Sequence, residues 1–135
     1  MVKAPLPKPL FIYVDGILIK EEKILLLKRN VEPFRGFWHV IGGHVEKNET
    51  LTAALRREFK EETDLDVCIG EVLGGRIEET FDRIKLIVVF KVYNPVGKVK
   101  LNEESQEYCW FDHVPTESVY DYSKFLAKPE ELSTI

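Results

Sequence analysis

One segment of this chain carries an unbroken helical signal. Residues 51–63 contain no glycine or proline, and Thr50 is a good N-cap because its hydroxyl can accept a hydrogen bond from the first turn. The sequence on either side favours strands, with β-branched and aliphatic runs separated by turn-forming residues. A helix placed between two sets of strands predicts an α/β fold in which helices cover a mixed β-sheet.

The remaining predicted elements are shorter. Strands are expected at residues 11–14, 17–19, 24–27 and 37–41 before the helix, and at 67–77, 84–93 and 108–111 after it. Asp15-Gly16 is predicted to form a turn or bulge, and Gly42-Gly43 is predicted to end a strand. A second helix is expected at residues 116–128, ending near Pro129.

The length and composition fit one domain. The chain has 135 residues, of which 44% are hydrophobic, and this suits a single core. Residues 1–9 include three prolines and are expected to form an extended N-terminal arm, which leaves residues 10–135 as the domain. The longest apolar run, residues 86–90, is too short to span a bilayer, so a membrane protein is not expected.

The first residues and the cysteines favour a cytoplasmic protein. The early prolines interrupt the apolar helix that a signal peptide requires. Cys68 and Cys109 match neither a metal-binding spacing nor a disulfide framework, so we expect two small buried hydrophobes in a reducing compartment. The net charge of −4 provides no excess of positive charge, so a nucleic-acid partner is not expected.

Two glutamates fall inside the apolar stripe of the predicted helix. With Leu55 at the centre of the stripe and about 100° per residue, Glu62 lies about 20° away and Glu58 about 60° away. Glu61 lies at the edge of the stripe. An ionised carboxylate removed from water must be protonated, paired or bound to a metal. Oxygen ligands on a rigid helix suit Mg²⁺ or Mn²⁺; the alternative is that this end of the helix is exposed and the glutamates are solvated.

The residues around this helix resemble a known motif, the Nudix box. The box reads Gly, five residues, Glu, seven residues, Arg-Glu-aliphatic-any-Glu-Glu-any-Gly-aliphatic. The similar residues here, from Gly43 to Leu65, are Gly43, Glu49, Arg57, Glu58, Phe59, Glu61, Glu62 and Leu65. Asp64 stands in place of the second glycine, which ends the helix in a left-handed conformation. Aspartate tolerates that conformation at a cost of about 1 kcal/mol, so we expect a small loss of stability and no loss of chemistry.

The resemblance to Nudix hydrolases implies a fold and a metal site. It implies a Nudix-like α/β/α sandwich with a mixed β-sheet, and Mg²⁺ as cofactor, for which Mn²⁺ could substitute. The metal ligands implied are the Gly42 carbonyl, Glu58, Glu61 and Glu62. The resemblance also implies that Arg57 pairs with Glu49 and holds the preceding loop on the helix, a structural role that supports the metal ligands.

The family's reaction implies further catalytic residues. Nudix hydrolases cleave a nucleoside diphosphate linked to another group, by attack of water on phosphorus, and Mg²⁺ neutralises the diphosphate and acidifies the water. The general base in this family is a glutamate of the box or of a loop before the last strand. In this chain the loop candidates are Glu104 and Glu107, with Glu103 behind them; each could instead be a solvated loop carboxylate. The catalytic set implied is Glu58, Glu61, Glu62, Glu104 and Glu107.

Residues near the box are candidates for substrate binding. Arg29 and Arg35 could clamp phosphates because planar guanidinium groups match phosphate oxygens. Phe34 and Trp38 could stack on a base. The alternatives are solvated arginines and core aromatics. Weaker candidates are Phe37 and Tyr93 for stacking, His39 and His44 for the walls of the site, and Glu46 for a place near the metal.

The resemblance leaves the substrate open. The segment at residues 29–36 looks like that of ADP-ribose pyrophosphatases, which favours ADP-ribose or a related nucleotide sugar. Residues 36–40 and 47–51 look like GDP-mannose hydrolases, but the box of that subgroup lacks a glutamate that this chain keeps. A nucleoside triphosphate pyrophosphatase for nucleotide sanitation is a further alternative. A non-catalytic nucleotide-binding regulatory module is disfavoured, because such a module has no need to bury three carboxylates.

A homodimer is expected. The N-terminal arm carries Val2 and Leu6, and Leu10 follows it, so these apolar side chains would otherwise be exposed. Extended segments of this kind often add to a sheet edge or lie on a neighbouring subunit. The alternative is a frayed terminus. The expected partners are therefore a small-molecule nucleotide and a second copy of the chain.

Overall fold

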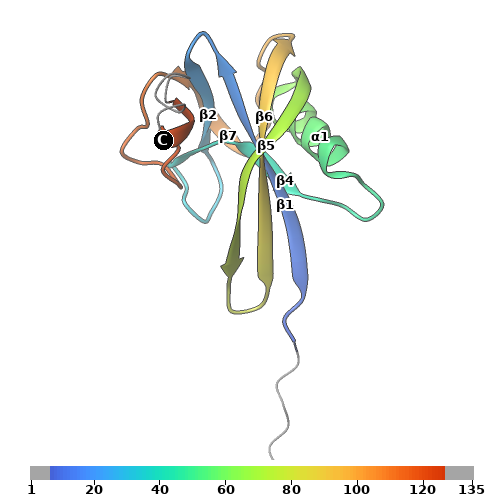
Figure 1. Ribbon diagram of the computed structural model, residues 1–135. Coiled ribbons are helices and arrows are strands. Elements are labelled where there is room, and N and C mark those ends of the chain that lie inside the picture. The colour runs from blue at the N-terminus through green and yellow to red at the C-terminus, as the bar shows by residue number, and fades with distance from the viewer. Residues whose placement is uncertain (1–6, 127–135) are drawn as a thin grey trace, which may run out of the picture.

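The structure, a computed structural model, describes residues 7–126 of the chain. Figure 1 shows a sheet with a helix on one side and a long hairpin that extends away from the rest. In chain order the elements are β1 (Leu10–Lys20), β2 (Lys23–Arg29), β3 (Trp38–His39), β4 (Ile41–His44), α1 (Leu51–Thr63), β5 (Asp66–Glu79), β6 (Ile84–Val96), β7 (Ser105–Phe111) and the 3₁₀ helix η1 (Ser123–Leu126). The predicted central helix is confirmed over its full length.

Strand β1 lies at the centre of the sheet. It pairs in parallel with β6 and antiparallel with β2 and β4. Strand β5 pairs with β6 at one edge, and β3 and β7 both pair with β2 at the other. The order β3-β2-β1-β6-β5, with its parallel β1–β6 pair, confirms the expected α/β fold with a mixed sheet.

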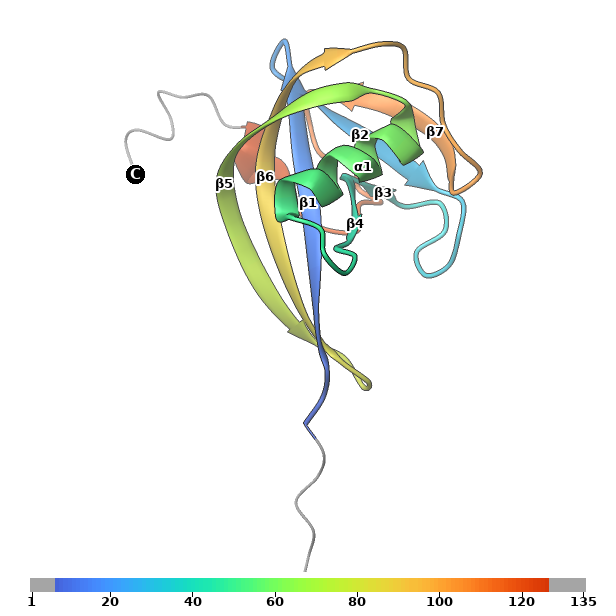
Figure 2. The same ribbon diagram turned by 90° about the vertical axis from the view of Figure 1, so that its right-hand side faces the viewer.

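The two faces of the sheet have separate hydrophobic cores. On one face α1 lies across the strands (Figure 2), and Leu55 and Phe59 pack against Val14 and Leu18 of β1. Side chains alternate between the faces along a strand. Ile17, which precedes Leu18, accordingly points to the opposite face, where the segment after β7 covers the second core.

The second predicted helix, at residues 116–128, is wrong over the residues that the structure describes. Up to Leu126 the segment forms a β-bridge and the short helix η1, and residues 127 and 128 lie outside the described part. The backbone of residues 117–119 pairs with Trp38 of β3 instead of with itself. The Ser118 hydroxyl donates to the Pro115 carbonyl, and such local bonds compete with a helix. The second layer of the sandwich is therefore an irregular segment in this range.

The predicted breaks at two glycine-containing dipeptides are also wrong, because both dipeptides lie inside strands. Asp15-Gly16 continues β1, and a Cβ atom on Gly16 would lie 2.5 Å from the Cε2 atom of Phe59. Gly42-Gly43 lies within β4 and pairs with residues 14 and 15 of β1. Glycine is needed at these positions because other side chains approach the strands closely, and no turn forms.

Two expectations from the composition can be compared with the structure. Cys68 is exposed on β5 and Cys109 is half-buried on β7, so the prediction of two buried cysteines is wrong for Cys68. Both thiols are free. Among residues 7–126, no helix has the length and apolar character needed to cross a bilayer.

Candidate metal and active site

Helix α1 places its glutamates against the sheet. The Thr50 hydroxyl accepts a hydrogen bond from the Ala53 amide at 3.1 Å, so the helix begins at the predicted cap. Glu62 is only 6% exposed. The side chain of Glu58 is 14% exposed and that of Glu61 is 55% exposed. The helical-wheel prediction is therefore confirmed, and the alternative of a solvated helix end holds only for Glu61.

The C-terminal end of α1 shows what Asp64 does in place of glycine. Asp64 has φ 61° and ψ 17°, the left-handed conformation, and its amide donates to the Lys60 carbonyl at 3.0 Å. This is the helix-ending geometry that glycine adopts most easily. The backbone after the box therefore has the expected conformation despite the substitution.

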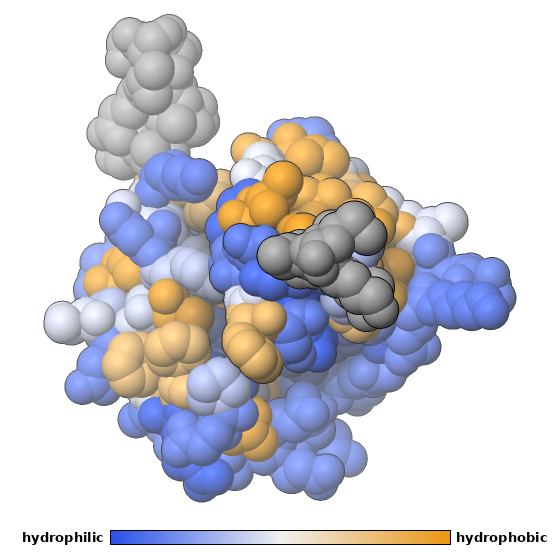
Figure 3. Space-filling model, turned by 90° about the horizontal axis from the view of Figure 1, so that it is seen from below, coloured by the Kyte–Doolittle hydropathy of each residue, from blue (hydrophilic) through white to orange (hydrophobic). Residues whose placement is uncertain are grey.

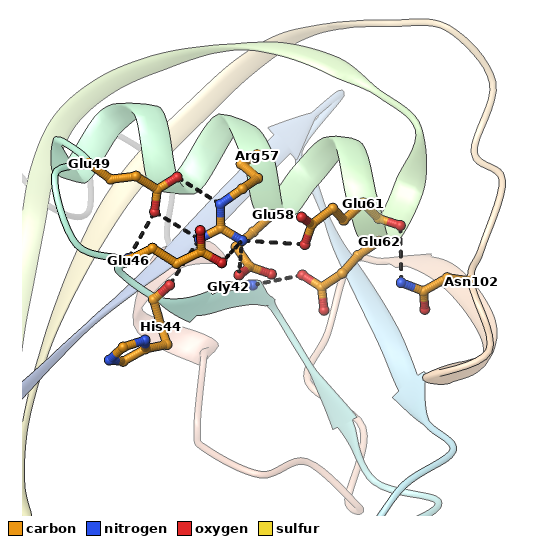
Figure 4. Close-up of polar contacts among 9 residues, drawn as sticks. All are labelled: Gly42, His44, Glu46, Glu49, Arg57, Glu58, Glu61, Glu62 and Asn102. Atoms are coloured by element: carbon orange, nitrogen blue, oxygen red, sulfur yellow. Dashed lines mark hydrogen bonds and ion pairs between the residues drawn. The ribbon is translucent and has the colours of Figure 1, made fainter.

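Strand β4 brings its backbone up to the glutamates of α1. A Cβ atom on Gly43 would lie 2.4 Å from Oε1 of Glu58, so only glycine leaves room for this carboxylate. The Gly42 amide donates to Oε2 of Glu62 at 3.3 Å (Figure 4). The Gly42 peptide, whose carbonyl is an expected metal ligand, thus lies beside the buried carboxylate.

Arg57 holds the loop before the helix, as Figure 4 shows. Its guanidinium donates to both carboxylate oxygens of Glu49, at 2.7 and 2.9 Å, and to the His44 carbonyl at 3.0 Å. It also donates to Glu58 at 2.9 Å and to Glu61 at 3.3 Å. Hydrogen bonds from Arg57 lower the pKa of Glu49 to about 2, so this carboxylate stays charged. The predicted Arg57–Glu49 pair is present in the structure.

The buried carboxylates repel one another. Burial raises the pKa of Glu58 to about 7, although the neighbouring Arg57 acts in the opposite direction. Burial also raises the pKa of Glu62 well above its ordinary value, and the negative charges of Glu58 and Glu104 add to this effect. A cation placed between these groups would relieve both costs.

The donor set fits a hard divalent cation, with some ligands from outside the protein. In the described range, no three His, Cys, Asp or Glu side chains are grouped closely enough to hold a metal ion by themselves. Glu58 and Glu62 provide carboxylate oxygens and Gly42 a carbonyl oxygen. Mg²⁺ commonly binds one or two carboxylates and completes its shell with waters and substrate phosphates. The residues present match that pattern.

Of the loop glutamates, the structure brings Glu104 to the helix and leaves Glu107 elsewhere. The Glu104 amide donates to Asn102, whose side chain in turn donates to the Glu61 carbonyl of α1. The negative charge of Glu104 also raises the pKa of both Glu58 and Glu62. Glu107 is the partner of Lys28 in the β2–β7 ladder. By alternation that position belongs to the face of the sheet away from α1. Glu103 contributes its carbonyl, which accepts from the Asn30 side chain at 3.0 Å.

The candidate substrate residues are divided between the loop and the core. Arg29 donates to the Pro33 carbonyl at 2.7 Å, at the base of the loop between β2 and β3. Arg35 and Phe34 on this loop are both more than half exposed. Trp38 instead packs edge-on against Phe111, at 4.8 Å between ring centroids, in the second core. The loop residues are therefore available to a ligand, and Trp38 is largely a core residue.

The weaker candidates occupy varied positions. His39 is neutral at pH 7, because burial and the nearby Arg29 lower its pKa to about 4. The His44 ring packs against Phe11 and Tyr13 of β1, away from the glutamates. The Glu46 carboxylate forms an ion pair with Arg57, with 3.7 Å between Oε1 and Nη1. Phe37 packs against Phe34, and the Tyr93 ring lies beside Gly70 of β5.

Sequence reasoning missed Asp15, which lies on the other side of the Gly42 peptide from Glu62. A Cβ atom on Gly42 would lie 2.3 Å from Oδ1 of Asp15. Burial raises the pKa of Asp15 to about 6, although Arg76 lies 3.5 Å away. Arg76 in turn stacks on the Tyr120 ring, 3.8 Å from its centroid. A carboxylate inside an apolar strand pattern was the available signal, and interpreting Asp15-Gly16 as a turn concealed it.

The comparison with known families agrees with this geometry. The family model described as NUDIX domain matches residues 10–125. The chain therefore belongs to the NUDIX domain family, as its box predicts.

Three similar proteins illustrate the range within this family. The chain is 37% identical over 105 residues to an ADP-ribose pyrophosphatase from Methanocaldococcus jannaschii, covering 73% of this chain and 60% of that protein. It is 32% identical over 91 residues to nucleoside triphosphatase NudI from Escherichia coli, covering 57% and 62%. The crystal structure of a MutT protein from Methanosarcina mazei matches with a TM-score of 0.71 at 28% identity, covering 96% and 97%. The chain spans between 39% and 62% of the length of the first curated relatives it matches.

Proposed function

We propose that this protein hydrolyses the diphosphate linkage of a nucleoside diphosphate derivative, with ADP-ribose or a related nucleotide sugar as substrate. The observation that carries the proposal is the pair of buried glutamates, Glu58 and Glu62, packed against the glycines of β4 with Glu104 nearby. Two buried carboxylates that repel each other, with Arg57 as the cationic partner of Glu58, destabilise the fold unless a cation binds them. The similarity to an ADP-ribose pyrophosphatase supports the choice of substrate.

The metal site would use oxygen ligands from α1 and β4. Glu58, Glu62 and the Gly42 carbonyl would hold Mg²⁺ or Mn²⁺, with Glu61 contributing through water because its side chain is more exposed. When bound, the ion supplies charge neutralisation for the diphosphate and acidifies a water molecule. Arg57 donates a hydrogen bond to Glu58 and so holds its carboxylate in place. The guanidinium of Arg57 is itself fixed by its bonds to both carboxylate oxygens of Glu49.

The remaining residues act on the water and the substrate. Glu104 would accept the proton of the attacking water, since its exposed carboxylate lies near the buried glutamates. Oxygen of this water bonds to phosphorus, and the bridging P–O bond breaks. The products are a nucleoside monophosphate and the phosphorylated leaving group. Arg29 and Arg35 at the loop between β2 and β3 would bind phosphate oxygens.

A nucleoside triphosphate is the second candidate substrate. The similarity to nucleoside triphosphatase NudI favours it, although that match covers only 57% of this chain. The same glutamates would serve both substrates, because the chemistry at phosphorus is shared. A regulatory module that only binds nucleotide would not account for the burial of Glu62.

A substrate panel tests the proposal. Nucleoside diphosphate sugars such as ADP-ribose and GDP-mannose, and dinucleotides, are incubated with Mg²⁺, and phosphate is measured after phosphatase treatment. For triphosphates, the released pyrophosphate is measured as phosphate after pyrophosphatase treatment. Activity should disappear with excess chelator and return with Mg²⁺ or Mn²⁺. Glu62→Gln should lower kcat by about 10³-fold or more while the protein stays folded. The control is Glu71→Gln, which changes an exposed glutamate on β5.

Two results would overturn this proposal. One is turnover that persists in excess chelator, which would exclude the metal site. The other is near-normal kcat in Glu62→Gln, which would remove Glu62 from the site. Hydrolysis of triphosphates alone would replace the nucleotide sugar by the second candidate.

The homodimer, the cytoplasmic location and the division at residue 10 stay proposals. Residues 1–6 of the arm lie outside the described residues. Seen from below in Figure 3, apolar side chains gather near the start of β1 and the β5–β6 hairpin. Leu10, Ile77 and Phe81 in this region are 59%, 72% and 97% exposed. Apolar exposure of this kind supports contact with a second copy of the chain.

A further inference from the structure

The segment between β6 and β7 closes against the C-terminal end of α1. The Lys100 amide donates to the Thr63 carbonyl at 2.9 Å. The Asn102 side-chain amide donates to the Glu61 carbonyl at 3.0 Å, as Figure 4 shows. The last carbonyls of a helix have no partner within the helix. These two bonds therefore fix the segment to the helix that carries the buried glutamates.

The same Asn102 side chain also holds Glu104. Its Oδ1 atom accepts a hydrogen bond from the Glu104 amide at 2.9 Å. On the other side, the Glu104 carbonyl accepts from the Asn30 amide at 2.8 Å, in the loop that follows β2. A single half-buried carboxamide thus joins the last turn of α1 to Glu104.

We propose that Asn102 is a positioning residue, which sets the place of the Glu104 carboxylate relative to the glutamates of α1. This inference rests on the proposed function, in which Glu104 accepts a proton from water. A carboxamide offers a donor and an acceptor at one planar end, whereas the ionised carboxylate of aspartate, the side chain of the same shape, only accepts and so cannot make both bonds. Without them the Glu104 backbone is held only from the Asn30 side, and a displacement of about 1 Å can cost about 10²-fold in rate.

Asn102→Ala removes both bonds and tests the proposal. We expect kcat to fall by about tenfold or more, with KM changed by less than about twofold, because substrate binding uses other residues. Exchange of the Glu104 amide hydrogen should become faster by about tenfold, which is a measurement independent of activity. The matched control is Gln106→Ala, which removes one side-chain bond of 3.0 Å to the Arg29 carbonyl in the neighbouring strand. The control should leave kcat and the exchange at Glu104 unchanged.

A double-mutant cycle with Glu104→Gln separates positioning from simple helix capping. If Asn102 acts through Glu104, then Asn102→Ala should lower kcat by less than about twofold in the Glu104→Gln background. A helix cap would instead lower kcat by the same factor in both backgrounds. If Asn102→Ala does not fold, Asn102→Asp keeps the acceptor for Glu104 and loses the donor to Glu61, and it should also lower kcat.

The possible outcomes distinguish this inference from the proposed function. An active wild-type protein in which Asn102→Ala and Asn102→Asp keep normal kcat refutes the role of Asn102 alone. Equal effects in the two backgrounds refute it as well. A wild-type protein that is inactive on the whole panel refutes the proposed function, and the inference with it.

Discussion

Replacing Glu58 by glutamine should stabilise the metal-free protein at alkaline pH while it destroys activity. The folded pKa of Glu58 is about 7, compared with 4.5 for the ordinary side chain, because burial disfavours its charged form. A folded pKa raised by about 2.5, at about 1.4 kcal/mol per unit, corresponds to about 3 kcal/mol of destabilisation once the group is ionised in both states. Glutamine carries no charge and can still accept from Arg57, and the weaker bond to Arg57 is already contained in this figure, because the folded pKa includes the opposing effect of Arg57.

The sign of the pH dependence follows from the proton count. Between pH 4.5 and 7 the folded protein keeps a proton on Glu58 that the unfolded chain releases, so stability of the wild type falls as pH rises through this window. Below pH 4.5 the carboxyl is neutral in both states and the penalty is absent. The advantage of Glu58→Gln should therefore be nearly absent at pH 4.5 and complete above pH 7, at about 3 kcal/mol or roughly 10–15 °C in Tm.

Thermal melts with chelator between pH 4.5 and 8 measure this difference. Glu71→Gln again provides the control, since its side chain is exposed and its Tm should follow the wild type at every pH. Excess Mg²⁺ should remove most of the difference at pH 8, because the ion stabilises only the chain that keeps the carboxylate. A Glu58→Gln protein that melts below the wild type at pH 8 without metal would refute the reasoning, as would a difference that does not change with pH.

Three further changes have expected outcomes. Arg57→Ala should lower Tm by roughly 5–10 °C and also lower kcat, because Glu49 and the loop before the helix lose their partner; Arg57→Lys should not restore either, and thermal melts with kinetics decide this. Asp64→Gly should raise the unfolding free energy by about 1 kcal/mol in denaturant titrations with kcat unchanged, and an unchanged stability would mean that the left-handed conformation carries no cost here. Deletion of residues 2–9 should convert a dimer into a monomer in light scattering; a monomeric full-length chain refutes the dimer, and a truncated dimer refutes only the role of the arm.

Local rules in the sequence determined the helix and the box. The N-cap at Thr50, the absence of glycine and proline up to Thr63, and the left-handed end at Asp64 all depend on residues within one or two turns. The helical periodicity of the sequence also places Glu62 in the buried stripe, without any tertiary contact. The resemblance of Glu49 and Arg57 to positions of the Nudix box likewise implied their pairing, which the structure contains.

The tertiary structure alone decided the course of the strands around the glycines and the form of the last segment. Gly16 lies in a continuous strand because Phe59, distant in sequence, occupies the space of its side chain. Residues 117–119 pair with Trp38 and so do not form a helix. In each case a contact made by a distant residue outweighs a weak local preference of about 1 kcal/mol or less per residue.

The choice between the loop glutamates also required the tertiary structure. Glu104 and Glu107 are three residues apart and chemically identical, so composition and motif spacing leave both open. The register of β7 on β2 pairs Glu107 with Lys28, which directs it to the face away from α1. The bonds from Asn102 and Asn30 hold Glu104 beside the end of α1, and neither asparagine belongs to the box. Strand register and loop closure are properties of the folded chain, and for this reason only the structure distinguishes these two glutamates.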